Sequence, residues 1–132
     1  MPMIAETEAE VKTKIRLGQQ KFKKGLGPLW DHNCALCDIE LSALLRASHS
    51  KPWKDSTDAE RIDPYNGLLL CCNHDALYDK GYIAFDGQGQ LQVSSHKTEV
   101  DYEKYFISGT KIARSVENKS YFKWHKKNIY KK

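Results

Sequence analysis

The chain has 132 residues, of which 40% are apolar and 29% charged, and its length and composition are typical of one globular domain. The net charge of +4 and the pI of about 8.8 permit anionic partners without requiring them. The longest apolar run, residues 68–72, is too short to cross a bilayer, and the N-terminus lacks the apolar segment of a signal peptide. We therefore expect a soluble, cytoplasmic protein without a membrane partner.

The first predicted element is a helix over residues 6–24, where apolar residues recur on one side among charged neighbours. Gly25 and Pro28 are expected to end this helix. Residues 34–37 read CALC, which predicts a tight knuckle. The chain then runs through an apolar turn or short helix into a strand that ends near His49.

The middle of the sequence predicts a strand, a loop and a helix around a cluster of polar residues. Residues 54–66 are polar and rich in turn formers, so we expect a loop that leads to a second strand over residues 67–71. A short helix is expected over residues 74–79, and Gly81 after it suits a positive φ.

The C-terminal third predicts a hairpin and two helices. Residues 82–93 alternate in polarity around a glycine-containing turn, which indicates a β-hairpin. One helix is expected within residues 98–109 and a second in the lysine-rich tail, residues 119–132. The tail's lysines either contact nucleic-acid phosphates or form a solvated helix face, and its aromatic residues either stack on bases or pack on the domain.

Two pairs of metal-binding side chains have the spacing of a structural zinc site. Cys34 and Cys37 are separated by two residues, and so are Cys71 and His74. Four such ligands complete a tetrahedral zinc site, whereas stable disulfides are rare in the cytoplasm. The alternative is that these cysteines are small, reduced core residues. Cys72 is the spare thiol, for which we expect a place in the core.

A pair of carboxylates follows the second pair of zinc ligands. Asp75 and Asp79 are four residues apart, so a helix places them on one face, where they can bind a hard cation such as Mg²⁺ or Mn²⁺. By itself the spacing is weak support, because aspartates at this spacing usually face solvent.

Three blocks of the sequence resemble the HNH endonucleases, in the branch with AAHIKPW, NGLLL and LFDxG motifs. The blocks are CALC, ASHSKPW and DPYNGLLLCCNHDALYDKG, and the flanking segments extend the resemblance over residues 16–130. It implies an α+β fold, the ββα-metal finger with a zinc knuckle, flanked by an N-terminal helix, a β-hairpin and C-terminal helices. We expect one nuclease domain over residues 1–132, with a core at residues 30–86 and helical extensions at residues 6–24 and 99–131.

The resemblance also implies roles for individual residues. His49 matches the general base, and Asn66 matches the asparagine that orients this histidine or braces the loop. Asp75 stands where the last motif histidine, a metal ligand, is expected, and Asp79 matches a further ligand of some members. Many members have an acidic or histidine ligand where this chain has Ser48, so the metal is expected to be held by fewer protein groups, by Asn66 or through water. Asp75 in place of the histidine favours a magnesium-type ion. The alternative for either departure is a degenerate, inactive site.

The implied activity is hydrolysis of phosphodiester bonds, with DNA favoured over RNA and a setting in restriction or defence. A homodimer or a larger defence complex is a possible assembly. The alternative is a zinc-stabilised nucleic-acid-binding protein whose HNH site is inactive. The residues that we expect to contact substrate phosphates are all basic: Arg46, Lys51, Lys54, Lys126 and Lys127.

Overall fold

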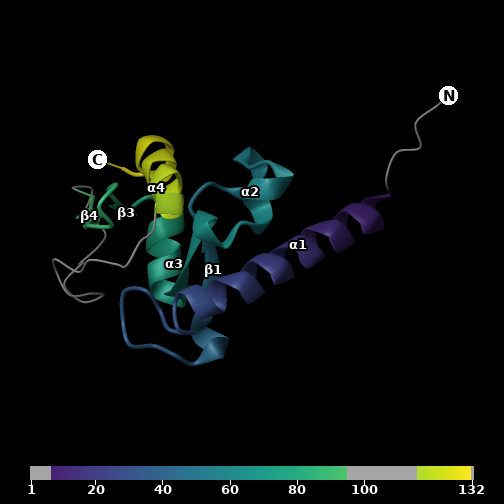
Figure 1. Ribbon diagram of the computed structural model, residues 1–132, viewed down its shortest axis with the longest axis horizontal. Helices are drawn as coiled ribbons and strands as arrows, with labels where there is room; N and C mark the ends of the chain where they lie inside the picture. The colour runs from purple at the N-terminus through teal and green to yellow at the C-terminus, as the bar shows by residue number, and fades with distance from the viewer. Residues whose placement is uncertain (1–6, 95–115, 132) are drawn as a thin grey trace.

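The computed structural model describes residues 7–94 and 116–131 (Figure 1). The expected helix within residues 98–109 therefore lies outside the described residues. No helix in the described ranges has the length and apolar content needed to cross a membrane. In chain order the helices and strands are α1 (Glu8–Leu29), β1 (Leu45–His49), α2 (Asp58–Ile62), β2 (Gly67–Cys71), α3 (Cys72–Asp79), β3 (Ile83–Phe85), β4 (Leu91–Val93) and α4 (Val116–Asn128).

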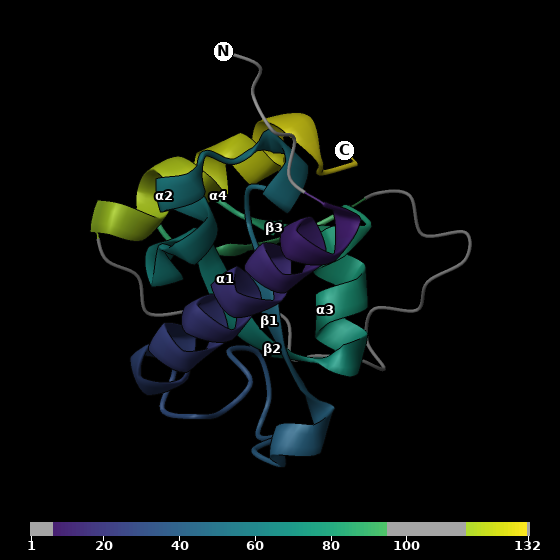
Figure 2. The same cartoon turned by 90° about the vertical axis from the view of Figure 1, so that its right-hand side faces the viewer.

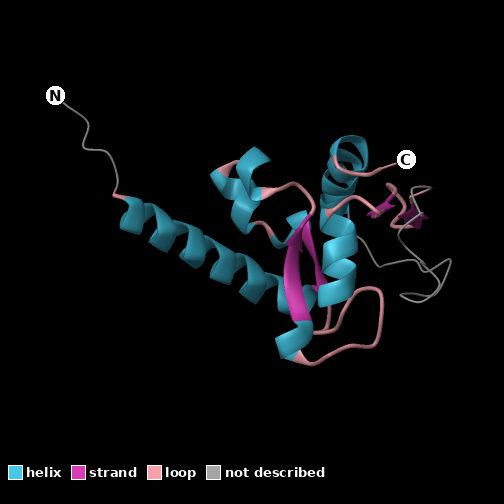
Figure 3. Ribbon diagram, turned by 180° about the vertical axis from the view of Figure 1, so that it is seen from behind, coloured by secondary structure: helices cyan, strands magenta, loops and turns pink. Residues whose placement is uncertain are grey.

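The centre of the molecule is an antiparallel pair of strands followed directly by a helix. Strands β1 and β2 pair with Leu45 opposite Cys71 and His49 opposite Gly67. All five residues of β2 are buried, because α1 packs on the strand pair and α3 follows β2 and contacts both strands (Figures 2 and 3). Successive strand residues point to opposite faces, so β1 presents alternate side chains to the two helices. This ββα unit confirms the expected α+β fold class.

Helix α1 is longer than the sequence predicted. Gly25 and Pro28 do not end it, and the helix continues to Leu29. The reason is tertiary packing, because Leu26 and Gly27 in its last turns are buried in the domain. Pro28 lies in the final turn, where its missing N–H removes one helix hydrogen bond.

The segment between the two central strands is more regular than the expected loop. It contains α2, whose N-terminus is closed by a capping box in which Thr57 and Glu60 exchange hydrogen bonds with each other's backbone N–H groups. The spacing Thr-x-x-Glu was the sequence signal for this helix. Helix α3 likewise begins two residues earlier than predicted, at Cys72.

The predicted hairpin and the final helix hold the far end of α3. Strands β3 and β4 pair antiparallel, which confirms the hairpin, and α4 packs on it with Phe122 against Phe85 at 5.5 Å between ring centroids. Gly81 has φ +81°, as predicted, and its carbonyl accepts a hydrogen bond from the Lys131 backbone at 2.8 Å. A Cβ at this glycine would collide with the carbonyl of Ile129, so only glycine allows the C-terminal segment to approach.

Candidate active site and metal centre

The four predicted zinc ligands come together in the structure. The ligand atoms of Cys34, Cys37, Cys71 and His74 all lie within 4.8 Å of one another. Nδ1 of His74 is 3.5 Å from Sγ of Cys34 and 3.3 Å from Sγ of Cys71. Tetrahedral zinc with its usual bond lengths separates a sulfur and a nitrogen ligand by about 3.5 Å, so the residues fit this ion.

The backbone around the first cysteine pair is fixed on the central strands. The amide of Ala35 donates to the carbonyl of Leu69 in β2 at 2.8 Å, and the amide of Cys34 donates to the carbonyl of Ile39 at 2.9 Å. The Leu36 amide donates to Sγ of Cys34 at 3.5 Å. Hydrogen bonds to β2 and within its own turn therefore hold the knuckle in place without the help of an ion.

The cysteines differ in their surroundings. Burial is the main reason that the pKa of the Cys37 thiol is raised to about 12, and the neighbouring Cys34 also raises it. A hydrogen bond from the backbone of Ile39 acts in the opposite direction. Binding of a metal would displace the thiol proton.

Cys72 is not part of the cluster, but the expected place in the core is wrong: its side chain is half-buried, with Sγ 3.3 Å from the carbonyl of Leu44. Helix α3 starts at Cys72, so this residue turns outward.

A second site lies on the other side of α3. It is an open pocket of about 330 Å³ that contains the predicted base and both predicted carboxylates. The residues that line it are Ala47, Ser48, His49, Pro52, Trp53, Asp75, Tyr78 and Asp79.

His49 is held by three neighbours. Its ring stacks on Phe22 of α1 at 3.7 Å between centroids, and Trp53 meets it edge-on at 6.0 Å. Its Nε2 is 2.9 Å from the carbonyl oxygen of Arg61 at the end of α2. Since a carbonyl only accepts, Nε2 carries the proton and Nδ1 has a free lone pair. Burial lowers the pKa of His49 below its usual 6.5, more than the bond to Arg61 raises it.

Asn66 braces the chain that connects the two central strands. It is fully buried, and its side-chain oxygen accepts from the Lys51 amide at 2.9 Å. Its NH₂ group donates to the carbonyls of Lys51 and Glu60 at 3.3 and 3.0 Å. Of the two roles implied by the resemblance, these contacts match the bracing of the loop.

The two carboxylates differ in how firmly they are placed. Asp75 is half-buried and accepts a short hydrogen bond from the hydroxyl of Ser48 in β1. Asp79 is exposed one turn further along α3. Among residues 7–94 and 116–131 the cysteine cluster is the one group of three or more metal-binding side chains within common reach. The pocket thus suits an ion that keeps several waters and takes one or two carboxylates, as Mg²⁺ does.

The expected phosphate contacts are scattered. Lys51 is bound to Glu60 at 3.1 Å from both carboxylate oxygens, and its ammonium lies 5.8 Å from the ring of Trp124. Arg46 lies three residues before His49 on β1 and donates to the carbonyls of Ala43 and Leu45. The remaining three are Lys54, exposed beside Trp53, and Lys126 and Lys127 on α4.

Two residues that position the site were not singled out from the sequence. Tyr78 is fully buried, and its hydroxyl donates to Oγ of Ser50 at 2.7 Å, which ties α3 to the end of β1. Burial raises the pKa of Tyr78, so its hydroxyl keeps its proton. His125 of α4 stacks on Tyr78 at 3.8 Å, and its Nε2 is 2.8 Å from the Tyr78 carbonyl. The aromatic residues in the tail were the available signal, and they pack on the domain.

Comparisons with known proteins agree with this geometry. Residues 34–86 match a family model described as HNH endonuclease, a segment that contains the cysteine cluster and the whole ββα unit. A similar solved structure is that of a "Modification dependent TagI restriction endonuclease", with a TM-score of 0.54 and 18% identity over 80% of this chain. The match covers 36% of that protein, and at this identity it shows a shared fold. A search of curated proteins found no match.

Proposed function

We propose, from the HNH endonuclease segment at residues 34–86, that the protein is a metal-dependent endonuclease that hydrolyses phosphodiester bonds in DNA. The observation that carries this proposal is the shared pocket of His49, Asp75 and Asp79. A potential base and two carboxylates meet there on an open surface, next to a ββα unit of the matching fold.

His49 is suited to take a proton from the attacking water. Its Nε2–H donates to the Arg61 carbonyl, which leaves Nδ1 as the basic atom. Because burial lowers its pKa, the ring is neutral at pH 7 and ready to accept a proton. Stacking on Phe22 fixes the plane of the ring, so the base is positioned before substrate arrives.

Asp75 and Asp79 are the proposed ligands of the catalytic ion, Mg²⁺ or Mn²⁺. A divalent ion between them would polarise the scissile phosphate and stabilise the departing oxygen. Asp75 is held by Ser48, so the serine that replaces the usual ligand acts through the carboxylate. This contact supports a working site despite the departure from the family pattern.

The cysteine cluster is the proposed site of a separate structural zinc ion, because three thiols and one imidazole form a closed, largely buried ligand set. We also propose that residues 1–132 act as one nuclease domain, with the core at residues 30–86 and helical extensions at residues 6–24 and 99–131.

We further propose a cytoplasmic role in restriction or defence, with DNA rather than RNA as the substrate. The proposed assembly is a homodimer or a larger complex. The fold shared with a restriction endonuclease supports this setting. Of the proposed phosphate contacts, Lys51 is engaged by Glu60, whereas Lys54 and Lys127 are exposed and accessible.

A second candidate function is DNA binding without cleavage. Among residues 7–94 and 116–131 the pocket at His49 has no group of three metal-binding side chains within common reach, which favours a site that no longer binds an ion. The two candidates differ in whether the chain nicks DNA.

A plasmid-nicking assay with Mg²⁺ or Mn²⁺ tests the proposal. We expect cleavage by the wild-type chain, and His49→Asn should slow it by roughly 10²–10⁴-fold while DNA binding persists. His32→Asn is the matched control, because His32 is exposed outside the pocket, and it should cleave normally. Binding without nicking by the wild-type chain under either ion would instead support the second candidate.

A further inference from the structure

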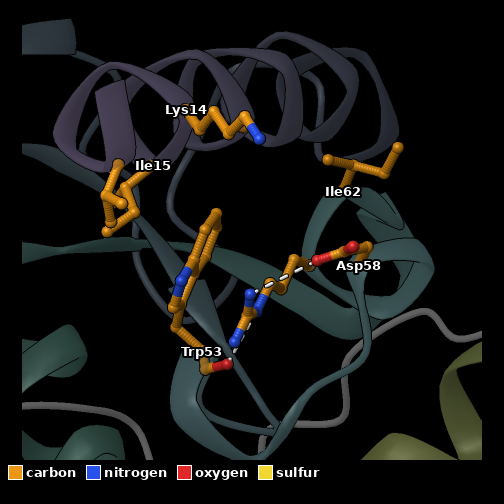
Figure 4. A pocket seen from close by; sticks show the side chains of 8 residues that line it. Lys14, Ile15, Trp53, Asp58 and Ile62 are labelled. Atoms are coloured by element: carbon orange, nitrogen blue, oxygen red, sulfur yellow. Dashed lines mark hydrogen bonds and ion pairs between the residues drawn. The ribbon is translucent and has the colours of Figure 1, made fainter. Parts of the chain in front are cut away.

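A second groove lies beside the catalytic pocket, between the N-terminal half of α1 and the α2 segment (Figure 4). Its volume is about 710 Å³, more than twice that of the pocket at His49. Trp53 and Lys14 enter it from opposite walls. The residues that line it are Val11, Lys14, Ile15, Gly18, Trp53, Asp58, Arg61 and Ile62.

The groove and the catalytic pocket share Trp53 as a wall. The indole edge packs on α1 so tightly that a Cβ at Gly18 would lie 2.8 Å from it. Its ring also meets His49 edge-on at 6.0 Å. A polymer that crosses Trp53 therefore passes from the groove to the proposed base, which a small ligand confined to the groove would not.

The charges along the groove favour an anionic polymer. Its lining has two cations, Lys14 and Arg61, and one carboxylate, Asp58, which is 3.3 Å from the Arg61 guanidinium. Between residues 11 and 30, α1 and its end contain six basic residues and no acidic one. The N-terminal half of α1 extends away from the body of the domain (Figure 1). An acidic partner is therefore attracted along the helix as well as at the groove.

The apolar lining is distributed like that of a nucleotide site. Val11, 41% exposed, and Ile15 lie on the α1 wall, and Ile62 lies opposite. Apolar side chains next to cations suit a sugar and base whose phosphate faces the charges. The guanidinium of Arg61 lies 4.8 Å from the centre of the Trp53 ring, and its Nε donates a hydrogen bond to the Trp53 carbonyl. These two contacts hold it in place.

We propose that this groove binds the DNA strand immediately beside the bond that is cut, with Trp53 separating the flanking nucleotides from the scissile phosphate. The assignment of the cut position rests on the proposed nuclease function, whereas strand binding in the groove does not. Lys14 then contacts a flanking phosphate, and Val11 and Ile15 contact the adjacent sugar or base.

The salt dependence of binding tests the charge contact. DNA binding is measured in the His49→Asn chain, which removes cleavage but not the groove. Adding Lys14→Gln should lower the slope of log K against log salt by about 0.9, the value of one lost phosphate contact. Lys12→Gln is the matched control, because Lys12 is on the same helix, pairs with Glu8 and does not line the groove. Equal slopes for the two variants would overturn the contact.

Crosslinking tests the path of the strand. A photoreactive group is attached to a cysteine at Val11 in the groove, or at Thr13 on the opposite side of the helix, with Cys72→Ser to remove the half-exposed thiol. We expect crosslinks from position 11, and not from position 13, to nucleotides within a few positions of the cut.

The two proposals fail in different ways. If the wild-type chain cleaves DNA but positions 11 and 13 crosslink equally or not at all, the groove proposal is wrong and the nuclease proposal stands. If it binds DNA through the groove without cleaving it, the reverse holds. Absence of DNA binding by the wild-type chain overturns both.

Discussion

The two sides of helix α3 show how one element serves two different sites. His74 points into the buried cluster of thiols, while Asp75, the next residue, faces the open pocket with His49. The cluster has four ligand side chains, three of which are buried. The pocket has two carboxylates and space for water and phosphate. A structural ion needs a complete set of protein ligands, whereas a catalytic ion needs open coordination positions for water or substrate.

The two sites also depend on different supports. The cluster is fixed by hydrogen bonds between the knuckle and β2, such as that from Ala35 to Leu69. The pocket depends on the outer helices, because α1 supplies Phe22 against His49 and α4 supplies His125 against Tyr78. The comparison predicts that a substitution in the cluster disturbs both sites, whereas a substitution in the pocket disturbs the pocket alone.

Loss of a zinc ligand should have the largest effect. Cys34→Ser removes one of four ligands, and the binding energy of a structural zinc, about 10–16 kcal/mol in small zinc-finger peptides, is folding energy. We expect loss of bound zinc, a large fall in Tm and loss of cleavage, measured by metal analysis and thermal unfolding.

The spare thiol is the control for that experiment. Cys72→Ser changes a half-buried group outside the cluster, so we expect full zinc content and a change in stability below about 1 kcal/mol. If Cys34→Ser kept its zinc and its Tm, α3 would not depend on the cluster and the comparison would break.

The second largest effect should come from the carboxylates of the pocket. Asp75→Asn removes the charge that Ser48 holds in place, and we expect the metal concentration for half-maximal cleavage to rise by more than the roughly 10–100-fold that loss of an outer-shell partner costs. Asp79→Asn changes an exposed group, so about tenfold is expected. Both variants should keep the wild-type Tm to within a few degrees and the wild-type zinc content. The comparison would fail if either one lost zinc.

The smallest effect concerns the support that α4 gives to α3. Burial lowers the pKa of His125 to about 4, so the folded chain keeps this ring neutral where the unfolded chain, near pH 6.5, takes up a proton. Stability should therefore fall as the pH is lowered from 6.5 toward 4, by about 2 kcal/mol between pH 7 and 5 from this residue. Urea unfolding at several pH values measures it.

His125→Gln separates this effect from other acid effects. Glutamine keeps a donor for the Tyr78 carbonyl but has no proton to gain, so the pH dependence in this window should become shallower. His49, whose pKa burial also lowers, remains in the variant and contributes in the same direction. An unchanged pH dependence in His125→Gln would show that His125 is not the source.

The cluster of Cys34, Cys37, Cys71 and His74 and the central strands were predictable because their signals are local. Two CxxC-like spacings and an apolar strand need no knowledge of distant residues, and the structure brings Cys34 and Cys71 together as expected. The length of α1 was not predictable in this way. It depends on the burial of Leu26 and Gly27 by other elements, which outweighs the helix-breaking tendency of Gly25.

The surroundings of the predicted site residues were also beyond the sequence. Lys51 is close to His49 in sequence, yet the structure pairs it with Glu60, because α2 folds back over the strand end. The same helix supplies the Arg61 carbonyl that fixes the tautomer of His49. An irregular loop has no fixed geometry, so the expectation of a loop over residues 54–66 could not foresee either partner.

The alternation of β1 limits how such a protein can evolve. Ser48 faces α3 and His49 faces α1, and one inserted or deleted residue in the strand would exchange them. The strand must therefore keep its length in descendants, whereas the connection over residues 50–66 can gain or lose residues away from the contacts of Asn66. Insertions there that also spare the Trp53 and Arg61 contacts of His49 would alter what the pocket accepts while His49 stays in place.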